Sequence, residues 1–533
     1  MTRSICVVRL LLSLFAIDVF GLPSRAQLSP SETDALSKLQ SSANAVACSA
    51  TDASSCAQAA AKLMPIILGE SPMVENLRKL TDEIGGRVSG TPEMAKAVEW
   101  GVTGFRAAGV DVHTEKYKLP VMWKEGATRL IITAPASATA GGATLRAVSE
   151  GWAPGTTREG IEANVIDIGD GSDLEMTRAG NLKGAVLLVH TEIGSTWADL
   201  FNEYMRPPGI IARAVTEGAA AILWTGARER LLLYRHTNSL NGEVDKIPQA
   251  VVAREDALRL GRLVLASRGS SQGKVRVKLT MLNDIGGPVE QENVVGEIRG
   301  YEKPDEVVIL GAHLDSWELG TGALDNGCNA ALVIEAARAI KAMGVLPKRT
   351  IRFILFSGEE QGTIGSHEYV KAHAAELDKI RAVIVFDDGS GRSTGFSLGG
   401  RTDTDLPLRQ ILKPLEAWNI GEHTPDASFG TDNFDFLLEG VPTFVANQEV
   451  SNYLANYHAA SDSFDKVDQR ELKMNTVIAA LTAWGIADRS EPIGKRQTRA
   501  ELDAMVKQTG LDQQMRLLGY WEQWQSGARG RKP

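Results

Sequence analysis

EVVILGAHLDSWELGTGALDNGCNA, residues 306–330, joins an apolar run to a glycine-rich loop that holds one histidine and two aspartates. The apolar run predicts a buried strand, and the following NAALVIEAARAIKAMG, residues 329–344, predicts a helix. Charged groups at the end of a buried strand cost free energy unless they are paired or bind a ligand. His313, Asp315 and Asp325 are therefore candidate site residues.

Strand and helix patterns alternate on both sides of this stretch. Apolar strands are expected in NVVGEIRG (293–300), RTIRFILFS (349–357) and RAVIVFD (381–387), with a helix in EYVKAHAAEL (368–377). Strand–helix–strand order favours an α/β fold with a doubly wound, mixed and mostly parallel sheet. The strands are continuous apolar runs, as is typical of strands buried on both faces.

Other regions flank this α/β domain, which we expect over residues 71–134 and 289–490. A helical segment is expected over 27–70, and a helical tail with Trp521 and Trp524 over 491–533. Residues 135–288 carry short strands separated by glycine-rich turns, which predicts a β-rich inserted domain.

The N-terminus has the order of a secretory signal peptide over residues 1–26. Arg3 and Arg9 precede an apolar run, and small residues before Ala26 offer a cleavage site. A membrane anchor is the alternative, but the run is shorter than the roughly 20 residues a spanning helix needs, and Arg9 and Asp18 interrupt it. We expect a secreted or periplasmic protein with no stable membrane span once the signal is removed.

Composition and cysteine content restrict the remaining options. The 533 residues have a formal charge of −9 without long single-sign blocks, which disfavours a nucleic-acid partner. Cys48 and Cys56 either form a local disulfide in an oxidising compartment or remain two small apolar residues. Cys328 would be left unpaired near the candidate site.

Three successive predicted strands deliver polar groups to the same edge of the sheet. In open α/β sheets ligands bind beyond the carboxyl ends of the strands. The strand-end groups there are His313 and Asp315, Glu359 and Glu360, and Asp387 and Asp388, while Asp325 and His458 lie in nearby loops.

Taken one at a time, these groups have ordinary explanations. A Glu-Glu pair suits a helix N-terminus, Asp-Asp-Gly suits a turn, and His-x-Asp occurs by chance. Together, converging carboxylates without a basic partner would repel one another, so a pair of divalent cations is the simplest neutraliser. Imidazole and carboxylate without a thiolate set suit zinc. Two such metals activate a water for acyl hydrolysis, and a free carboxylate then accepts the proton.

The motifs resemble those of the co-catalytic zinc exopeptidases, the family of bacterial aminopeptidases and carboxypeptidase Q. The resemblance covers about residues 75–488, and the chain is most similar to the carboxypeptidase Q branch. It rests on these segments: GAHLDSWELGTGALDNG, PKRTIRFILFSGEEQGTIGS, DDGSG, FGTDNFDFLLEGVP, YHAASD and the upstream LTDEIGGRVSGTPEMAKAVEW. The resemblance also implies that residues 135–288 are a protease-associated domain.

The resemblance implies a role for each candidate residue. Asp325 would bridge two zinc ions, with His313 and Asp387 completing one site and Glu360 and His458 the other. Asp388 competes with Asp387 for its role, and the Asp-x-Gly pattern favours Asp387. The remaining roles would be Glu359 as general base, Asp315 as the carboxylate that orients His313, and Gly430, Thr431, Asp432 and Tyr457 as pocket residues. A cis peptide is expected at Asp325–Asn326.

These roles define a zinc metallopeptidase that acts on short peptides with a free amino end. Dipeptidase activity of the carboxypeptidase Q kind and aminopeptidase activity on longer peptides both stay open, as does a homodimer. The other di-zinc exopeptidase branch is disfavoured by the short gap from His313 to Asp325 and by the early insert. An inactive receptor-like binding protein would have lost ligands, and a one-zinc acyltransferase such as a glutaminyl cyclase would lack the insert.

Overall fold

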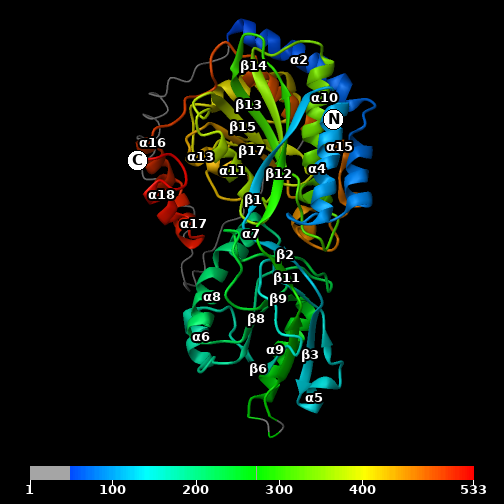
Figure 1. Ribbon diagram of the computed structural model, residues 1–533, viewed down its shortest axis with the longest axis vertical. Coiled ribbons are helices and arrows are strands. Elements are labelled where there is room, and N and C mark those ends of the chain that lie inside the picture. The colour runs from blue at the N-terminus through cyan, green and yellow to red at the C-terminus, as the bar shows by residue number, and fades with distance from the viewer. Residues whose placement is uncertain (1–48, 270, 272) are drawn as a thin grey trace, which may run out of the picture. The chain divides into compact units, whose positions relative to one another are not determined.

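The apolar residues 307–310 lie in β13 (Lys303–His313), the central strand of a seven-stranded sheet (Figure 1). The computed structural model describes residues 49–269, 271 and 273–533. Val308 and Leu310 belong to one hydrophobic core, whereas Val307 and Ile309 belong to another. Because successive side chains of a strand point to opposite faces, the sheet is buried on both sides.

The sheet is mixed, with parallel strands at its centre. Four neighbouring strands, β14, β13, β15 and β17, run parallel, and the three outer strands are antiparallel to their neighbours. In spatial order the strands are β1 (Asp111–Leu119), β12 (Val289–Ile298), β14 (Arg349–Phe356), β13, β15 (Ile380–Val385), β17 (Thr443–Gln448) and β16 (Ser393–Ser397).

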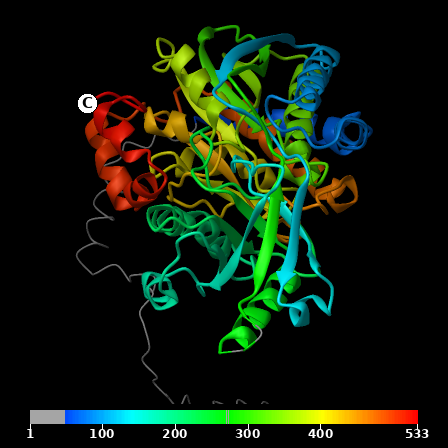
Figure 2. The same ribbon diagram turned by 60° about the horizontal axis from the view of Figure 1, so that its bottom comes forward.

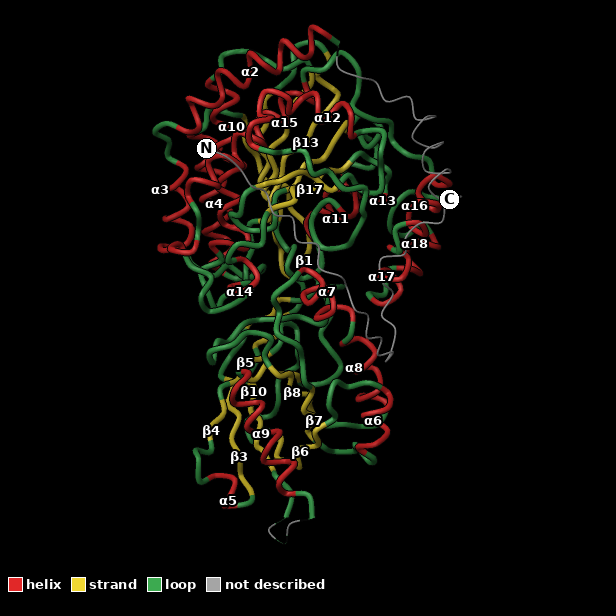
Figure 3. The backbone as a smooth tube through the Cα atoms, turned by 180° about the vertical axis from the view of Figure 1, so that it is seen from behind, coloured by secondary structure: helices red, strands yellow, loops and turns green. Residues whose placement is uncertain are grey.

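Helices cover both faces of this sheet (Figure 3). One face packs against α2 (Ala50–Leu68), α4 (Pro92–Ala107), α10 (Cys328–Ala342) and α15 (Gln469–Ala487). The other face packs against α11 (Ile364–Ala372) and α13 (Phe434–Leu438). The expected doubly wound α/β fold is therefore confirmed. Shorter helices are α3 (Met73–Arg78), α12 (Asp405–Leu412) and α14 (Tyr453–Asn456).

A second sheet, of eight strands, is formed between β1 and β12. We call residues 120–288, which separate these two paired strands, the insert. In spatial order its strands are β4 (Thr144–Leu145), β3 (Thr128–Ala134), β10 (Arg276–Met281), β6 (Ile161–Asp167), β7 (Val186–Val189), β8 (Ala221–Thr225), β9 (Gln249–Val252) and β5 (Ala147–Ser149). A two-stranded ribbon of β2 (Met122–Lys124) and β11 (Asp284–Gly286) joins the segments that enter and leave it.

The insert begins earlier and contains more helix than its sequence suggested. β3 precedes residue 135 but pairs with β10, so it belongs to the second sheet. β6, β7, β8 and β9 are parallel, and parallel neighbours need crossover connections. Helices lie in the first two of these connections, whereas the described residues 226–248 between β8 and β9 form no helix. The helices of the insert are α5 (Ala136–Thr139), α6 (Asp173–Ala179), α7 (Trp197–Met205), α8 (Pro207–Thr216) and α9 (Arg254–Ser267).

The C-terminal segment forms three short helices that share a hydrophobic core with α13. Figure 2 shows these helices, in red, grouped together: α16 (Arg499–Gln508), α17 (Leu511–Leu517) and α18 (Trp521–Ser526). Trp524 and Tyr520 pack there with Phe434 and Leu438 of α13. The C-terminal tail therefore packs against α13, which closely follows the candidate pocket residue Thr431 in the sequence.

Some expectations concern residues outside the described part of the chain. The signal peptide at 1–26 and Cys48 lie there, as does the first half of the helical segment 27–70, whose second half contains α2. Cys56 is buried in α2. Among the described helices, none is both long enough and apolar enough to cross a bilayer.

Candidate active site

The candidate residues gather at the carboxyl ends of the parallel strands. His313 is the last residue of β13, Glu359 and Glu360 follow β14, and Asp387 follows β15. His458 lies in the connection after β17. This is the edge at which a doubly wound sheet collects ligand-binding groups.

Five of these side chains form two groups of three around Asp325. His313 Nε2 lies 3.2 Å from Asp325 Oδ1 and 2.9 Å from Asp387 Oδ1. His458 Nε2 lies 3.1 Å from Asp325 Oδ2 and 3.0 Å from Glu360 Oε2. All five residues are buried, and Asp325 turns one oxygen toward each group.

Both imidazoles turn an Nε2 atom toward the carboxylates. Backbone carbonyls of Asp315 and Arg235 lie 3.0 Å from Nδ1 of His313 and His458, respectively. A carbonyl can only accept, so each Nδ1 carries its hydrogen and, in a neutral ring, Nε2 presents a lone pair. Within the described part of the chain, Asp325 Oδ2, Glu360 Oε1 and Asp387 Oδ1 are buried and have no hydrogen-bond partner. Lone pairs that converge in this way fit a cation between them.

The electrostatics of the site favour positive charge at the same place. Burial lowers the pKa of His458, but Glu360 and Asp325 outweigh burial and raise this pKa to about 10. Burial raises the pKa of Glu360 to about 7, partly offset by His458. The carboxylates therefore attract either a proton or a metal ion.

Glu359 stands beside these groups but belongs to neither. Its side chain lines the adjoining cavity. Burial raises the pKa of Glu359 well above its ordinary range, with His313 opposing and Asp387 adding to the effect. A carboxyl in such a position can exchange a proton with a molecule in the cavity.

Asp315 supports the site through the backbone more than through the imidazole. Its carboxylate accepts the N–H groups of Glu359 and Glu360, each at 3.3 Å, and its Oδ1 lies 3.7 Å from His313 Nδ1. The main-chain carbonyl of Asp315 holds the histidine instead. Asp315 thus links the ends of β13 and β14.

Asp462 and Arg87 hold the loop that carries Asp325. Both are buried, and the sequence alone suggested no role for either. The Asp462 carboxylate accepts the N–H groups of Ala323, Leu324 and Asp325 at 3.1, 2.7 and 3.1 Å. Burial raises the pKa of Asp462 to about 7. The guanidinium of Arg87 donates to the carbonyls of residues 314, 321 and 322. Asp462 ends the motif YHAASD, which was its only sequence signal.

The insert contributes a third supporting residue, Arg235. Its N–H donates to the carbonyl of His458 at 2.9 Å, while its own carbonyl accepts from His458 Nδ1. The fully buried guanidinium lies 2.5 Å from Glu125 and 2.6 Å from Glu318. Nothing in the sequence around Arg235 indicated this contact with a residue 223 positions away.

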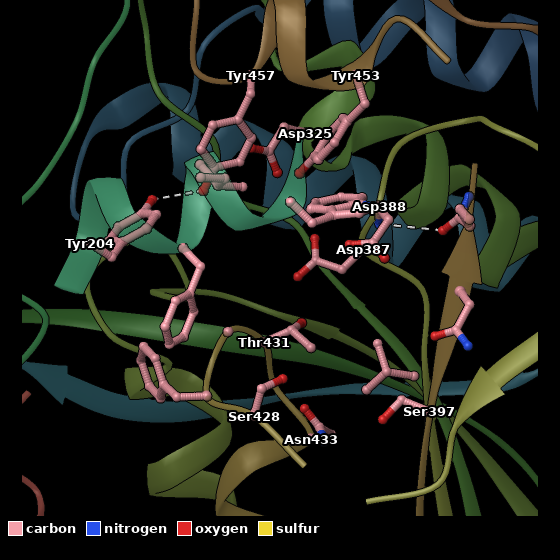
Figure 4. A pocket seen from close by; sticks show the side chains of 18 of the residues that line it. Tyr204, Asp325, Asp387, Asp388, Ser397, Ser428, Thr431, Asn433, Tyr453 and Tyr457 are labelled. Atoms are coloured by element: carbon pink, nitrogen blue, oxygen red, sulfur yellow. Dashed lines mark hydrogen bonds between the residues drawn. The ribbon is translucent and has the colours of Figure 1, made fainter. Parts of the chain in front are cut away.

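A cavity of about 600 Å³ opens beside the two groups (Figure 4). Gly430, Thr431 and Tyr457 line it, as expected for pocket residues. Asp432 does not line it, because its side chain is fully buried behind the loop. Further lining residues are Trp197, Leu200, Phe201, Tyr204, Met205, Ser397, Thr424, Asp426, Ser428, Phe429, Asn433, Asn447, Gln448 and Tyr453.

Asp387 and Asp388, the two candidates for one ligand role, occupy different positions in the site. Asp387 is grouped with His313, whereas Asp388 lines the cavity and its N–H donates to Gln448 at 3.3 Å (Figure 4). Asp387 is therefore the better placed ligand. The cis peptide expected at Asp325–Asn326 is present.

Comparison with known proteins identifies the family. Residues 293–483 match Peptidase family M28. Carboxypeptidase Q of Rattus norvegicus is 30% identical over 421 residues, which cover 78% of this chain and 85% of that protein. Aminopeptidase YwaD of Bacillus subtilis is 25% identical, covering 80% and 87% of the two chains. The chain belongs to peptidase family M28 and is an enzyme of this class, as its motifs predicted.

Solved structures agree with the fold. A peptidase M28 precursor from Shewanella amazonensis SB2B has a TM-score of 0.73 at 26% identity, covering 84% of this chain and 99% of that chain. BSAP, a zinc aminopeptidase from Bacillus subtilis, has a TM-score of 0.60 at 20% identity, covering 79% and 98%. The second likeness concerns the fold alone.

Proposed function

We propose that this peptidase is a two-zinc exopeptidase that hydrolyses dipeptides or short peptides with a free amino end. The observation that carries the proposal is the pair of buried ligand groups that share Asp325. His313 and Asp387 would hold one ion, Glu360 and His458 would hold the other, and Asp325 would serve both groups. The similarity to carboxypeptidase Q and to zinc aminopeptidases supports zinc as the metal.

The bound zinc ions would supply Lewis acidity, which polarises the scissile carbonyl and makes water more acidic. The protein's own groups then handle the protons. The Glu359 carboxylate accepts a proton from the attacking water and returns it to the nitrogen of the leaving amine. Asp315 keeps Glu359 in place, since its carboxylate accepts the Glu359 N–H.

The acidic lining of the cavity supports recognition of a free amino end. Asp388 and Asp426 line it in addition to the ligand carboxylates, and an ammonium group complements such a lining. Two substrate classes are compatible with this acidic lining. They are dipeptides, by analogy with carboxypeptidase Q, and longer peptides, by analogy with an aminopeptidase. An inactive binding protein fits less well, because no member of the ligand set or base is missing. The signal-like N-terminus supports action outside the cytoplasm.

Glu359→Gln tests the proposal most directly. The amide cannot accept the proton, so kcat should fall by about 10²–10⁴-fold. Both zinc ions should stay bound, because Glu359 is outside the ligand groups. Metal analysis and hydrolysis of free dipeptides, N-blocked dipeptides and aminoacyl anilides measure both effects.

Glu302→Gln, at an exposed position, serves as the matched control and should keep wild-type turnover. Cleavage of anilides would indicate an aminopeptidase, and cleavage of dipeptides alone the carboxypeptidase Q-like activity. A wild-type protein that is folded and zinc-loaded yet cleaves none of these substrates would refute the proposal.

A further inference from the structure

Helix α7 of the insert carries an apolar face that is not buried in the insert's own core. None of its nine residues is buried, and Trp197 and Phe201 are 38% and 41% exposed. A capping box between Thr196 and Asp199 fixes its first turn. Large apolar side chains left this open are a sign of a binding surface.

The exposed face of α7 is turned toward the candidate active site. The residues that line the cavity have helical spacing along a single face of the helix. They are Trp197, Leu200, Phe201, Tyr204 and Met205. Figure 4 shows the side chain of Tyr204 extending toward the cavity from this helix.

Contacts on the first sheet's side hold α7 beside the ligand groups. The hydroxyls of Tyr204 and Tyr457 lie 2.7 Å apart, and Tyr457 stacks on His458 with ring centroids 3.7 Å apart. The ring of Trp197 lies 5.9 Å from that of Tyr453. The helix is thereby tied to the loop that carries one candidate ligand.

The cavity has a different character on its two sides. Tyr204 lies on one side of Asp325 and Asp387 in Figure 4, and Ser397 lies on the other. Ser397 is accompanied in the lining by the polar residues Asp388, Thr424 and Asn447, and by one aliphatic residue, its strand partner Val445. An extended peptide across the site would meet an apolar wall with one side chain and a polar wall with the other.

We propose that the face of α7 forms an apolar subsite for the side chain of one of the two residues that flank the scissile bond. This inference rests on the proposed exopeptidase function and names its substrate class: peptides with a bulky aliphatic or aromatic residue at that position. Covering Phe201 and Trp197 with such a side chain removes apolar surface from water, which favours binding and the transition state alike. Selectivity would therefore reside in the insert, apart from the residues that act on the peptide bond.

Dipeptides with Ala, Leu or Phe at each position in turn, against an invariant partner, test the subsite. The wild type should prefer Leu or Phe over Ala by about tenfold or more in kcat/KM at one position. Phe201→Ala should lower kcat/KM about tenfold for the bulky substrate and leave the Ala substrate nearly unchanged. Phe201→Leu should retain most of the preference, and Trp197→Ala should reduce it independently.

Leu174→Ala is the matched control, because Leu174 is an apolar residue of the same insert, 59% exposed on α6 and outside the cavity lining. It should leave the preference intact. Equal activity on Ala and bulky substrates at both positions would overturn the subsite, as would Phe201→Ala and Trp197→Ala lowering kcat/KM equally for all substrates. Failure to cleave any substrate with a free amino end would instead refute the proposed function.

Discussion

Asp462 shows how a residue outside the candidate ligand groups can shape the site that they form. Its two oxygens accept three consecutive N–H groups ending at Asp325. In Asp462→Asn an NH2 group replaces one carboxylate oxygen. An NH2 group cannot accept a hydrogen bond from a backbone N–H, so at least one of the three bonds should be lost. Because such supporting contacts orient ligands, zinc affinity should fall by about 10–100-fold.

Zinc retention against increasing chelator concentration measures this effect without relying on activity. The exposed Asp465→Asn, three residues away, is the control and should retain zinc like the wild type. Unchanged retention in Asp462→Asn would mean that the Asp325 loop keeps its conformation without the carboxylate.

The sequence indicated the candidate ligand residues more clearly than the groups that support them. His313, Glu360 and Asp387 could be found because each closely follows an apolar strand whose direction fixes where its end lies. Asp462 acts on backbone N–H groups, and Arg235 acts through its own main chain, so neither role leaves a side-chain pattern. Asp432, expected among the pocket residues, is fully buried and is not one of the residues that line the cavity, since spacing alone does not tell which side chains a loop exposes.

The loop that carries Arg235 connects the insert to the metal-ligand loop. An isolated bridge pairs Tyr234 with Ala459, next to the reciprocal bonds between Arg235 and His458. Arg235→Ala leaves Glu125 and Glu318 without their buried partner, which should destabilise the protein by about 3–5 kcal/mol. The main-chain bonds to His458 remain possible in Arg235→Ala, but the loop that provides them loses the guanidinium anchor to Glu125 and Glu318. The loop should then hold His458 less firmly, so one of the two zinc ions should be lost before the other.

Denaturant unfolding and metal stoichiometry during chelator titration separate these effects. Arg230→Ala, at an exposed position in the same segment, should leave both measurements unchanged. Simultaneous loss of both zinc ions from Arg235→Ala would contradict a specific link between the insert and His458.

The arrangement of the whole chain could be predicted only in part. The alternation of strands and helices predicted the α/β fold class, which was confirmed, but it did not predict the order of the strands in the first sheet. The position of α7 could not be read from its amphipathic pattern, because a helix pattern does not say which surface the apolar face meets. The sequence likewise did not indicate what the C-terminal tail packs against. In the structure the tail packs against the loop that carries Phe429, whose ring centroid lies 5.4 Å from that of Tyr520.

A buried ion pair fastens this tail to α13. Arg529 donates to both oxygens of Asp435 at 2.7 and 2.6 Å, and His367 lies 2.9 Å from the same carboxylate. Burial would raise the pKa of Asp435, but Arg529 and His367 outweigh it and hold the pKa well below its ordinary value of 3.8. A carboxyl group whose pKa is lower in the folded than in the unfolded protein stabilises the fold at pH values above its unfolded pKa. This contribution is lost as the pH falls below about 4.

Arg529→Ala should therefore destabilise the protein by about 3 kcal/mol at pH 7, because it leaves the buried Asp435 carboxylate with His367 alone beside it in place of the bidentate guanidinium. The difference from the wild type should shrink as the pH falls below about 4, since protonated Asp435 no longer needs the guanidinium. Urea unfolding across this pH range measures the trend, and limited proteolysis at pH 7 should release the tail more readily from the variant. Lys507→Ala, exposed on α16, should unfold like the wild type. A stability difference for Arg529→Ala that is independent of pH would show that the guanidinium acts through packing on Tyr520, 4.2 Å from its ring centroid, and not through the charge of Asp435.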